Sequence, residues 1–363
     1  MNRRGFILST AWPLLSKRPP PVAHRFSGSA YEIGAMHGKV LKREIRAEAG
    51  PALRQLCATW KLSQSATLAR VVSSYEGVYR ELVPTSIEEM KGIAEGAELP
   101  YPFAFFAGIR DLLPSYEGCT TVVCPSSTTY SGSPIIGQTK DTSSPLSRYN
   151  LVFSKYDSGF RAISLAYPGW IGNICLTSHG VSWTGNTLYA PAAHGKLYPA
   201  SLLKRLFYES RSVREALDRA HGLRFGNGCF CAADRTGTAV CLEWIGGECD
   251  LIEIDRRYGH ANNVLGRFRK QETAPSSNAN SLLRQARIDS LLKARKQPVS
   301  AADFETWFTD HQHHPRSICR HTNSEDPDVT TAAFIADLAT LEFRVAVGNP
   351  CETQFAVHRL EDV

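Results

Sequence analysis

The sequence predicts an α+β protein in which stacked, largely antiparallel sheets are covered by helices. From Ser29 to about Pro114, apolar residues recur at helical spacing. At Cys119 the chain changes abruptly to short β-branched runs separated by turns, and helical blocks return later between the strands. These two regimes and the sharp change between them indicate one large fold whose strongest internal boundary lies at Cys119.

The helical third contains recognisable start and stop signals. "SAYE" (Ser29–Glu32) is a capping box, and apolar residues follow it at helical spacing. A second apolar stripe runs from Leu68 to Leu82 and is stopped by Pro84. A further capping box, "SIEE" (Ser86–Glu89), is expected to open a short helix that ends near Gly96.

The later chain is predicted to contain hairpins. "YNLVFSKY", the turn "DSG" and "FRAISLAY" form one hairpin pattern, and "GCFCAADRTGTAVCLEWIGGECDLIEI" predicts three strands around two turns. Helices are expected over Ser201–Ser210, through "SVREALDRA", near Ser281–Lys296 and over Ala302–Thr309, and "LEFRVAVGNP" and "QFAVHRL" are expected as closing strands.

Composition excludes several classes of protein. The 363 residues are 43% hydrophobic and 21% charged, with a formal net charge of +6 that is spread along the chain, so no nucleic-acid footprint is expected.

Residues 1–25 form a leader, in which Arg3 and Arg4 precede a short apolar run that cannot span a membrane. A twin-arginine-type export signal and a disordered leader both remain open, and so do export and a cytoplasmic location.

The ten cysteines are too sparse for a disulfide scaffold, and no CxxC pair is present. Cys229 and Cys231 lie on one face of a strand, which is poor zinc geometry without a second pair. The stretch from His311 to His321 holds four histidines and Cys319, but its spacing is not a standard zinc pattern and Pro315 interrupts it. The sequence therefore predicts a polar loop here, with no metal site and no cofactor.

Cys119 stands where a strand-initial thiol could act as a nucleophile. If the peptide bond before it were cut, Cys119 would gain an α-amino group, which titrates near pH ~8 and could serve as the base for its own thiol. Gly118 has no Cβ and lets the thiol approach the preceding carbonyl. Thr120 and Thr121 offer hydroxyls to position water or to polarise that carbonyl. Cys124 points to the opposite face and is expected to pack in the core.

The order of the motifs resembles a known family. "EIGAMHG", "EGCTTVVC", "IIGQTKDT", "YPGWIGNICLTSHGVSWTGNTL", "GHANN", "SICRH" and "VGNPC" together resemble the acyl-coenzyme A:6-aminopenicillanic acid acyltransferase family, the C45 cysteine peptidases, within the wider N-terminal-nucleophile hydrolases. The resemblance extends from about Phe26 to Val357. It implies a four-layer αββα sandwich and self-cleavage between Gly118 and Cys119, which would give a helical α chain (26–118) and a β chain (119–363) intertwined in one domain.

The resemblance also implies roles for individual residues. Cys119 would be the nucleophile, and Asp141 would support the new amino terminus. The amide of Asn262 would donate to the oxyanion, an interaction worth ~3 kcal/mol in analogous sites. Asn186 would orient the substrate or the oxyanion. Two departures from the family pattern, Thr139 and Lys140 in "GQTKDT", leave the substrate undecided, as does Asn263 after Asn262.

The implied reaction passes an acyl group from an amide or thioester to an amine or water through a thioester on Cys119. Acyl-coenzyme A is left open as the donor, and the expected partners are a small-molecule donor and acceptor and the protein's own two chains, with no nucleic acid and no membrane. The alternatives are an N-acyl amide hydrolase of the penicillin V or bile-salt type, and, from another class, an inactive binding or scaffold protein with the same fold.

Overall fold

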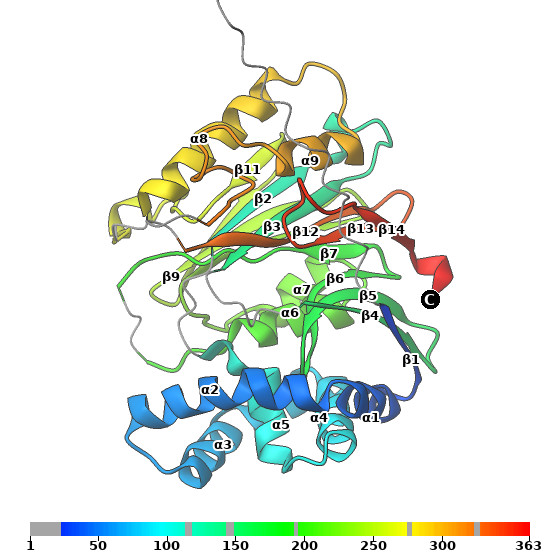
Figure 1. The fold of residues 1–363 in the computed structure, drawn as a ribbon, viewed down its shortest axis with the longest axis vertical. Coiled ribbons are helices and arrows are strands. Elements are labelled where there is room, and N and C mark those ends of the chain that lie inside the picture. The colour runs from blue at the N-terminus through cyan, green and yellow to red at the C-terminus, as the bar shows by residue number, and fades with distance from the viewer. Residues whose placement is uncertain (1–22, 113–117, 143–148, 192–194, 274–277, 323–326) are drawn as a thin grey trace, which may run out of the picture.

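The computed structural model describes residues 23–112, 118–142, 149–191, 195–273, 278–322 and 327–363, and the arginine pair of the leader lies outside them. Within these residues, two β-sheets stack face to face and helices cover both outer faces (Figure 1). This is the αββα arrangement, so the predicted fold class is confirmed. Its apolar cores lie between the sheets and beneath each helical layer. No helix among these residues is long and apolar enough to cross a bilayer.

The larger sheet has eight strands in the described residues. Their order is β1 (Ala23–Gly28), β4 (Asn150–Tyr156), β5 (Arg161–Tyr167), β6 (Trp170–Thr177), β7 (Val181–Trp183), β8 (Gly228–Asp234), β9 (Ala239–Ile245) and β10 (Glu248–Glu253). The β4–β5 hairpin and the β8–β9–β10 run follow the predicted patterns. β1 pairs in parallel with β4, so residues 23–25, which the sequence placed in the leader, belong to the sheet.

The second sheet carries the predicted nucleophile. Its order is β11 (Tyr258–His260), β2 (Gly118–Cys124), β3 (Ile135–Thr142), β12 (Val329–Asp337), β13 (Glu342–Val347) and β14 (Ala356–Arg359). β2 is a central strand, and its antiparallel pairing with β3 places Gly118 opposite Asp141 and Cys119 opposite Lys140. A strand therefore begins where the sequence changes character, at the proposed cleavage position.

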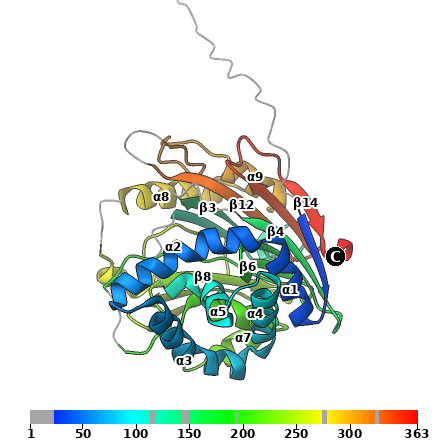
Figure 2. The same ribbon diagram turned by 60° about the horizontal axis from the view of Figure 1, so that its bottom comes forward.

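The two helical layers differ in size, as Figure 2 shows from another side. On the larger sheet lie α1 (Ala30–Val40), α2 (Lys42–Trp60), α3 (Gln64–Leu82), α4 (Pro84–Gly96), α5 (Tyr101–Gly108), α6 (Ala200–Glu209) and α7 (Val213–Ala220). On the second sheet lie α8 (Asn278–Ala294) and α9 (Ala301–Phe308).

The helix starts are partly as predicted. The capping box of Ser29 and Glu32 is present at α1. The capping box expected at Ser86 is wrong, because α4 already begins at Pro84 and Ser86 is buried within its first turn. The backbone angle of proline suits the first helical position. A residue there has no acceptor within the helix for its N–H, so the missing N–H of proline costs nothing and the helix starts at Pro84.

Candidate active site

Cys119 and Lys140 face each other across the β2–β3 pair. Residues directly opposite in antiparallel strands project to the same face of the sheet. Lys140 Nζ donates a hydrogen bond to Cys119 Sγ over 3.1 Å. Both residues are buried, with 1% and 8% of their surface exposed. A cation at this distance favours the thiolate, which is the nucleophilic form of cysteine.

The backbone nitrogen of Cys119 is bound by Asn262. Asn262 Oδ1 accepts from the Cys119 N–H over 2.9 Å and from Arg284 Nη2 over 2.8 Å, and its Nδ2 donates to the carbonyl of Thr187 over 3.0 Å. Asn262 follows β11, the strand that pairs with β2 on the side away from β3. The nitrogen that cleavage would turn into an amine therefore already has a fixed acceptor.

Arg284 of α8 is a buried residue of this site that the sequence patterns did not indicate. Its Nη1 donates to the carbonyl oxygen of Cys119 over 2.5 Å and to Thr120 Oγ1 over 3.0 Å, and its Nε donates to Asn280 Oδ1 over 2.7 Å. Burial lowers the pKa of Arg284, and the nearby charge of Asp141 opposes that shift. The guanidinium thus binds the β2 backbone on the helical side of the sheet.

Asp141 lies on the face opposite to that of Lys140, as the strand alternation predicts. Its Oδ1 accepts from Thr330 Oγ1 over 2.8 Å. Its Oδ2 lies 3.9 Å from Arg284 Nη1 and 3.8 Å from Arg320 Nη1, and it has no hydrogen-bond partner among the described residues. A carboxylate between two buried guanidinium groups is therefore the direct neighbour of Gly118 across the strands.

Gly118 is closely surrounded by these side chains. A Cβ placed on it would lie 2.6 Å from Arg320 Nη1 and 2.9 Å from Asp141 Oδ2. Such distances are shorter than non-bonded carbon contacts allow. Close packing therefore favours glycine here, because a larger residue would have to displace these buried side-chain ends.

Asn186 connects three parts of the site. Its Oδ1 accepts from Thr121 Oγ1 over 2.7 Å and from Gln138 Nε2 over 2.9 Å. Its Nδ2 donates to the carbonyls of His260 and Ala261 over 3.0 and 2.8 Å. Both N–H groups of the amide are thus engaged by the backbone that leads into Asn262. In this arrangement Asn186 fixes the neighbouring segment, and Thr121 is bound to it.

Two other buried cysteines contrast with Cys119. Cys124 packs beneath α8 and α9, as predicted, and burial raises the pKa of its thiol to about 12. Burial likewise raises the pKa of Cys175 to about 12. Thiols of this kind are inert near neutral pH. The lysine contact is what distinguishes Cys119 from these buried cysteines.

The structure brings the four predicted residues Cys119, Asp141, Asn186 and Asn262 into one hydrogen-bonded region, together with Lys140, Arg284 and Arg320. Lys140 was noted in the sequence only as a departure from a family pattern. Arg284 lies in a predicted helix whose pattern indicated no role for it, and Arg320 was quoted only as part of the motif "SICRH".

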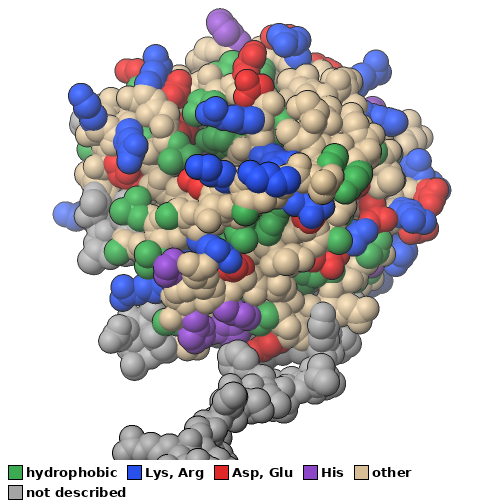
Figure 3. Space-filling view, turned by 90° about the horizontal axis from the view of Figure 1, so that it is seen from above, with side chains coloured by type: hydrophobic (Ala, Val, Ile, Leu, Met, Phe, Trp, Pro, Cys, Tyr) green, Lys and Arg blue, Asp and Glu red, His purple; other side chains and the backbone are tan. Residues whose placement is uncertain are grey.

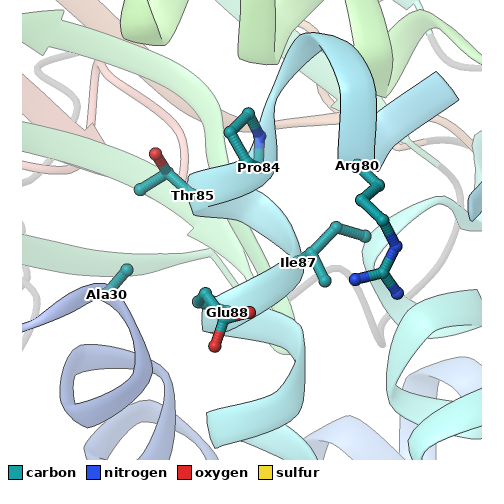
Figure 4. A pocket seen from close by; sticks show the side chains of 6 residues that line it. All are labelled: Ala30, Arg80, Pro84, Thr85, Ile87 and Glu88. Carbon is teal, nitrogen blue, oxygen red and sulfur yellow. The ribbon is translucent and has the colours of Figure 1, made fainter. Parts of the chain in front are cut away.

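Two surface pockets lie elsewhere. Figure 4 shows one of about 300 Å³ at the junction of α1, α3 and α4, lined by Ala30, Arg80, Pro84, Thr85, Ile87 and Glu88. Another, of about 770 Å³, lies between α1 and the β4–β5 turn. Neither contains Cys119 or its partners, so neither is the candidate active site.

Comparison with known proteins gives one family. The model of the acyl-coenzyme A:6-aminopenicillanic acid acyl-transferase family matches residues 128–352, which include Asp141, Asn186 and Asn262 and begin after Cys119. A curated relative, the 40 kDa form of acyl-coenzyme A:6-aminopenicillanic-acid-acyltransferase from Emericella nidulans, is 26% identical over 333 residues, covering 89% of this chain and 91% of the relative.

Solved structures give more distant similarities. A mutant of conjugated bile acid hydrolase from Clostridium perfringens aligns with a TM-score of 0.38 at 10% identity, over 66% of this chain and 96% of that chain. Penicillin V acylase from Agrobacterium tumefaciens aligns with a TM-score of 0.34 at 12% identity, over 63% and 74%. At these scores the alignments carry no argument about this chain.

Proposed function

The chain belongs to the acyl-coenzyme A:6-aminopenicillanic acid acyl-transferase family, and on that premise we propose that it is a self-processing cysteine enzyme of acyl transfer or amide hydrolysis. Cys119 is its nucleophile, and cleavage of the Gly118–Cys119 bond activates it. The proposed substrates are a small-molecule acyl donor, with acyl-coenzyme A as one candidate, and an amine or water as acceptor.

The contact between Lys140 Nζ and Cys119 Sγ, 3.1 Å long, is the observation that carries this proposal. An inert packing cysteine gains nothing from a buried ammonium group, and burying that charge costs free energy unless it is paired. A cysteine that must react as its thiolate requires such a partner. The inactive-scaffold alternative gives no reason for a lysine contact at this cysteine.

Self-cleavage begins with attack of Cys119 Sγ on the carbonyl carbon of Gly118. The carbon–sulfur bond forms, the carbon–nitrogen bond breaks, and the nitrogen takes up a proton to become the α-amine of Cys119. Water then hydrolyses the thioester and leaves a carboxylate on Gly118. Arg320, which lies against Gly118, is suited to stabilise the negative charge that develops on this carbonyl.

Acyl transfer then uses the new amino terminus. The α-amine accepts the thiol proton and passes it to the leaving group, while Sγ forms the acyl thioester. Asn262 Oδ1 already accepts from this nitrogen and would orient the amine. The positive charge of Lys140 disfavours a second one nearby and thereby keeps the amine neutral. The oxyanion role expected of Asn262 stays a prediction, and Asn186 is assigned the positioning of Asn262.

Denaturing electrophoresis with N-terminal sequencing of the expressed protein tests the processing step. We expect one chain ending at Gly118 and one beginning Cys-Thr-Thr, and we expect the Cys119→Ala variant to remain uncut. The matched Cys124→Ala variant should be cut normally. A single full-length wild-type chain would refute self-processing.

Two further measurements separate the remaining alternatives. Product analysis with and without an acceptor amine distinguishes acyl transfer from hydrolysis, because both pass through the same acyl-enzyme and differ only in deacylation. A thiol-reactive acyl probe should add its mass to the chain that begins at Cys119. An unmodified chain would support the inactive scaffold.

A further inference from the structure

Four side chains from three segments meet near the start of β12 and the end of β13 in the second sheet. They are His311, which follows α9, Cys319 and His321 from the loop before β12, and Cys351, which follows β13. One ligand atom from each lies within 4.8 Å of the ligand atoms of the other three. Figure 3 shows histidine side chains gathered on this face of the molecule. The sequence pattern predicted no metal here, and Cys351 was noted only as the last residue of "VGNPC".

Four of the six spacings among these atoms are close to those of a tetrahedral metal site. The Sγ atoms of Cys319 and Cys351 are 3.5 Å apart, and the Nε2 atoms of His311 and His321 are 3.1 Å apart. His321 Nε2 lies 3.4 Å from Cys351 Sγ and 3.8 Å from Cys319 Sγ. Zinc–sulfur bonds of ~2.3 Å and zinc–nitrogen bonds of ~2.0–2.1 Å at tetrahedral angles give edges of about 3.8, 3.4 and 3.5 Å for sulfur pairs, nitrogen pairs and mixed pairs.

Hydrogen bonding alone does not explain the arrangement. His321 Nε2 faces one nitrogen and two sulfur atoms, and this single ring atom carries at most one proton. A central cation would satisfy all four ligand atoms at once. Outer groups are also in place, because Asn349 Nδ2 donates to Cys319 Sγ over 3.8 Å and Glu352 Oε1 lies 4.0 Å from His321 Nδ1.

We propose that His311, Cys319, His321 and Cys351 bind one zinc ion as a Cys₂His₂ structural site. Two thiolates and two imidazoles are the ligand set that zinc prefers in tetrahedral sites, and four protein ligands leave no position open for a substrate. The ion joins the segment after α9, the loop before β12 and the segment after β13. The metal site does not depend on the proposed function.

The second cysteine–histidine cluster in the described residues is different. It consists of Cys229, Cys241 and His260, which offer only three ligands. The ring nitrogens of His260 are already paired with the carbonyl of Ala261 at 2.9 Å and with Glu243 Oε1 at 2.8 Å. This imidazole has no nitrogen left for a metal, so we assign no metal to this cluster.

A bound zinc ion would also position Arg320 in the candidate active site. Unlike the metal site itself, this role rests on the proposed function. Cys319 and His321 flank Arg320, whose guanidinium lies against Gly118 and 3.8 Å from Asp141 Oδ2. Coordination of both neighbours would fix the backbone that carries this guanidinium. The ion therefore positions Arg320 and takes no part in the chemistry.

Elemental analysis of the full chain, expressed with zinc and purified under reducing conditions, tests the site. We expect about one zinc per chain. The Cys351→Ser variant should lose it, and the Cys249→Ser variant, which changes a cysteine that is also half-buried and lies outside the cluster, should retain it. Cys119→Ala should keep its zinc as well, so failure of the proposed function and failure of the metal site give different results.

Cobalt(II) substitution of the wild-type protein gives a readout that does not require a folded variant. We expect the visible absorption of tetrahedral cobalt together with thiolate-to-cobalt charge transfer, and added zinc should displace both. Soluble wild-type protein that holds no zinc above background, before and after addition of zinc, would overturn the proposal. A Cys319–Cys351 disulfide in metal-free protein, seen by intact mass, would overturn it too.

Discussion

The ammonium group of Lys140 lies 3.1 Å from the sulfur of Cys119. The two residues are opposite each other on adjacent strands, and both are buried. Under the proposed function, the pair would allow a thiol in the interior to react as its thiolate.

Lys140→Met should remove the charge while keeping the length and packing of the side chain. Without the cation the thiolate forms less readily, so the pH at which Cys119 is half-reactive toward a small alkylating agent should rise by about one unit or more. Intact mass after alkylation over a pH series measures this. Lys140→Arg should largely preserve the profile, and Lys155→Met, on the exposed side of β4, should not move it. An unchanged profile in Lys140→Met would contradict the assigned role.

Gly118→Ala should impair both folding and cleavage. The added methyl would lie 2.6 Å from Arg320 Nη1 and 2.9 Å from Asp141 Oδ2, and relieving such overpacking costs about 1–3 kcal/mol. Chemical denaturation measures the free energy of unfolding, and electrophoresis measures the cleaved fraction. Gly226→Ala is the matched control, because a Cβ there meets nothing within 4 Å. Equal effects of the two substitutions would argue against the packing explanation.

Asn186→Asp should destabilise the protein because it replaces the amino group that donates to two buried carbonyls with a charged acceptor. We expect a loss of about 1–3 kcal/mol in the free energy of unfolding. Asn227→Asp changes a side chain that also donates to two carbonyls, those of Ala190 and Pro191, from a more exposed position. Its loss should be smaller. A larger loss in Asn227→Asp would refute the structural role of Asn186.

The buried pair of His260 and Glu243 predicts a pH dependence of stability. Burial alone lowers the pKa of His260. The hydrogen bond and charge of Glu243 raise this pKa by more than burial lowers it, so that the net shift is upward from 6.5. Burial raises the pKa of Glu243, and the hydrogen bond and charge of His260 lower it to a net value below 4.5. Because folding raises the pKa of His260, this histidine stabilises the fold below pH 6.5, and the stabilisation is lost as the pH rises through the pKa of the folded state. Because folding lowers the pKa of Glu243, this carboxyl group stabilises the fold above pH 4.5, and the stabilisation is lost as the pH falls through the pKa of the folded state.

The contribution of this pair to the free energy of unfolding should therefore be largest between pH 4.5 and 6.5. Denaturant titrations of the wild type and of His260→Gln over a pH series measure it. The difference between the two should shrink as the pH becomes more alkaline. His221→Gln, which changes an exposed residue after α7, should follow the wild type at every pH. A difference that grows with pH would show that the assigned charge states are wrong.

Local patterns predicted much of the fold. Alternation and turn residues located the strands of the hairpins, and the capping box at Ser29 located the start of α1. The start of α4 was predicted three residues too late, because the proline at the helix start competed with a capping pattern inside the first turn. β1 was not predicted, since it is short and its partner, β4, is more than a hundred residues away along the chain.

The candidate site, like the fold, could be predicted only in part from the sequence. Cys119 and Gly118 follow from their place at the start of a strand, and the order of motifs along the chain indicates Asp141, Asn186 and Asn262. The contact between Lys140 and Cys119 depends on the register of β2 against β3, which a connection of ten residues leaves undetermined. Arg284 reaches the Cys119 carbonyl from a helix 165 residues away, and Cys351 joins His311 from beyond two further strands. Side-chain encounters of this range depend on how the layers pack, because periodicity and spacing describe only the residues near each other along the chain.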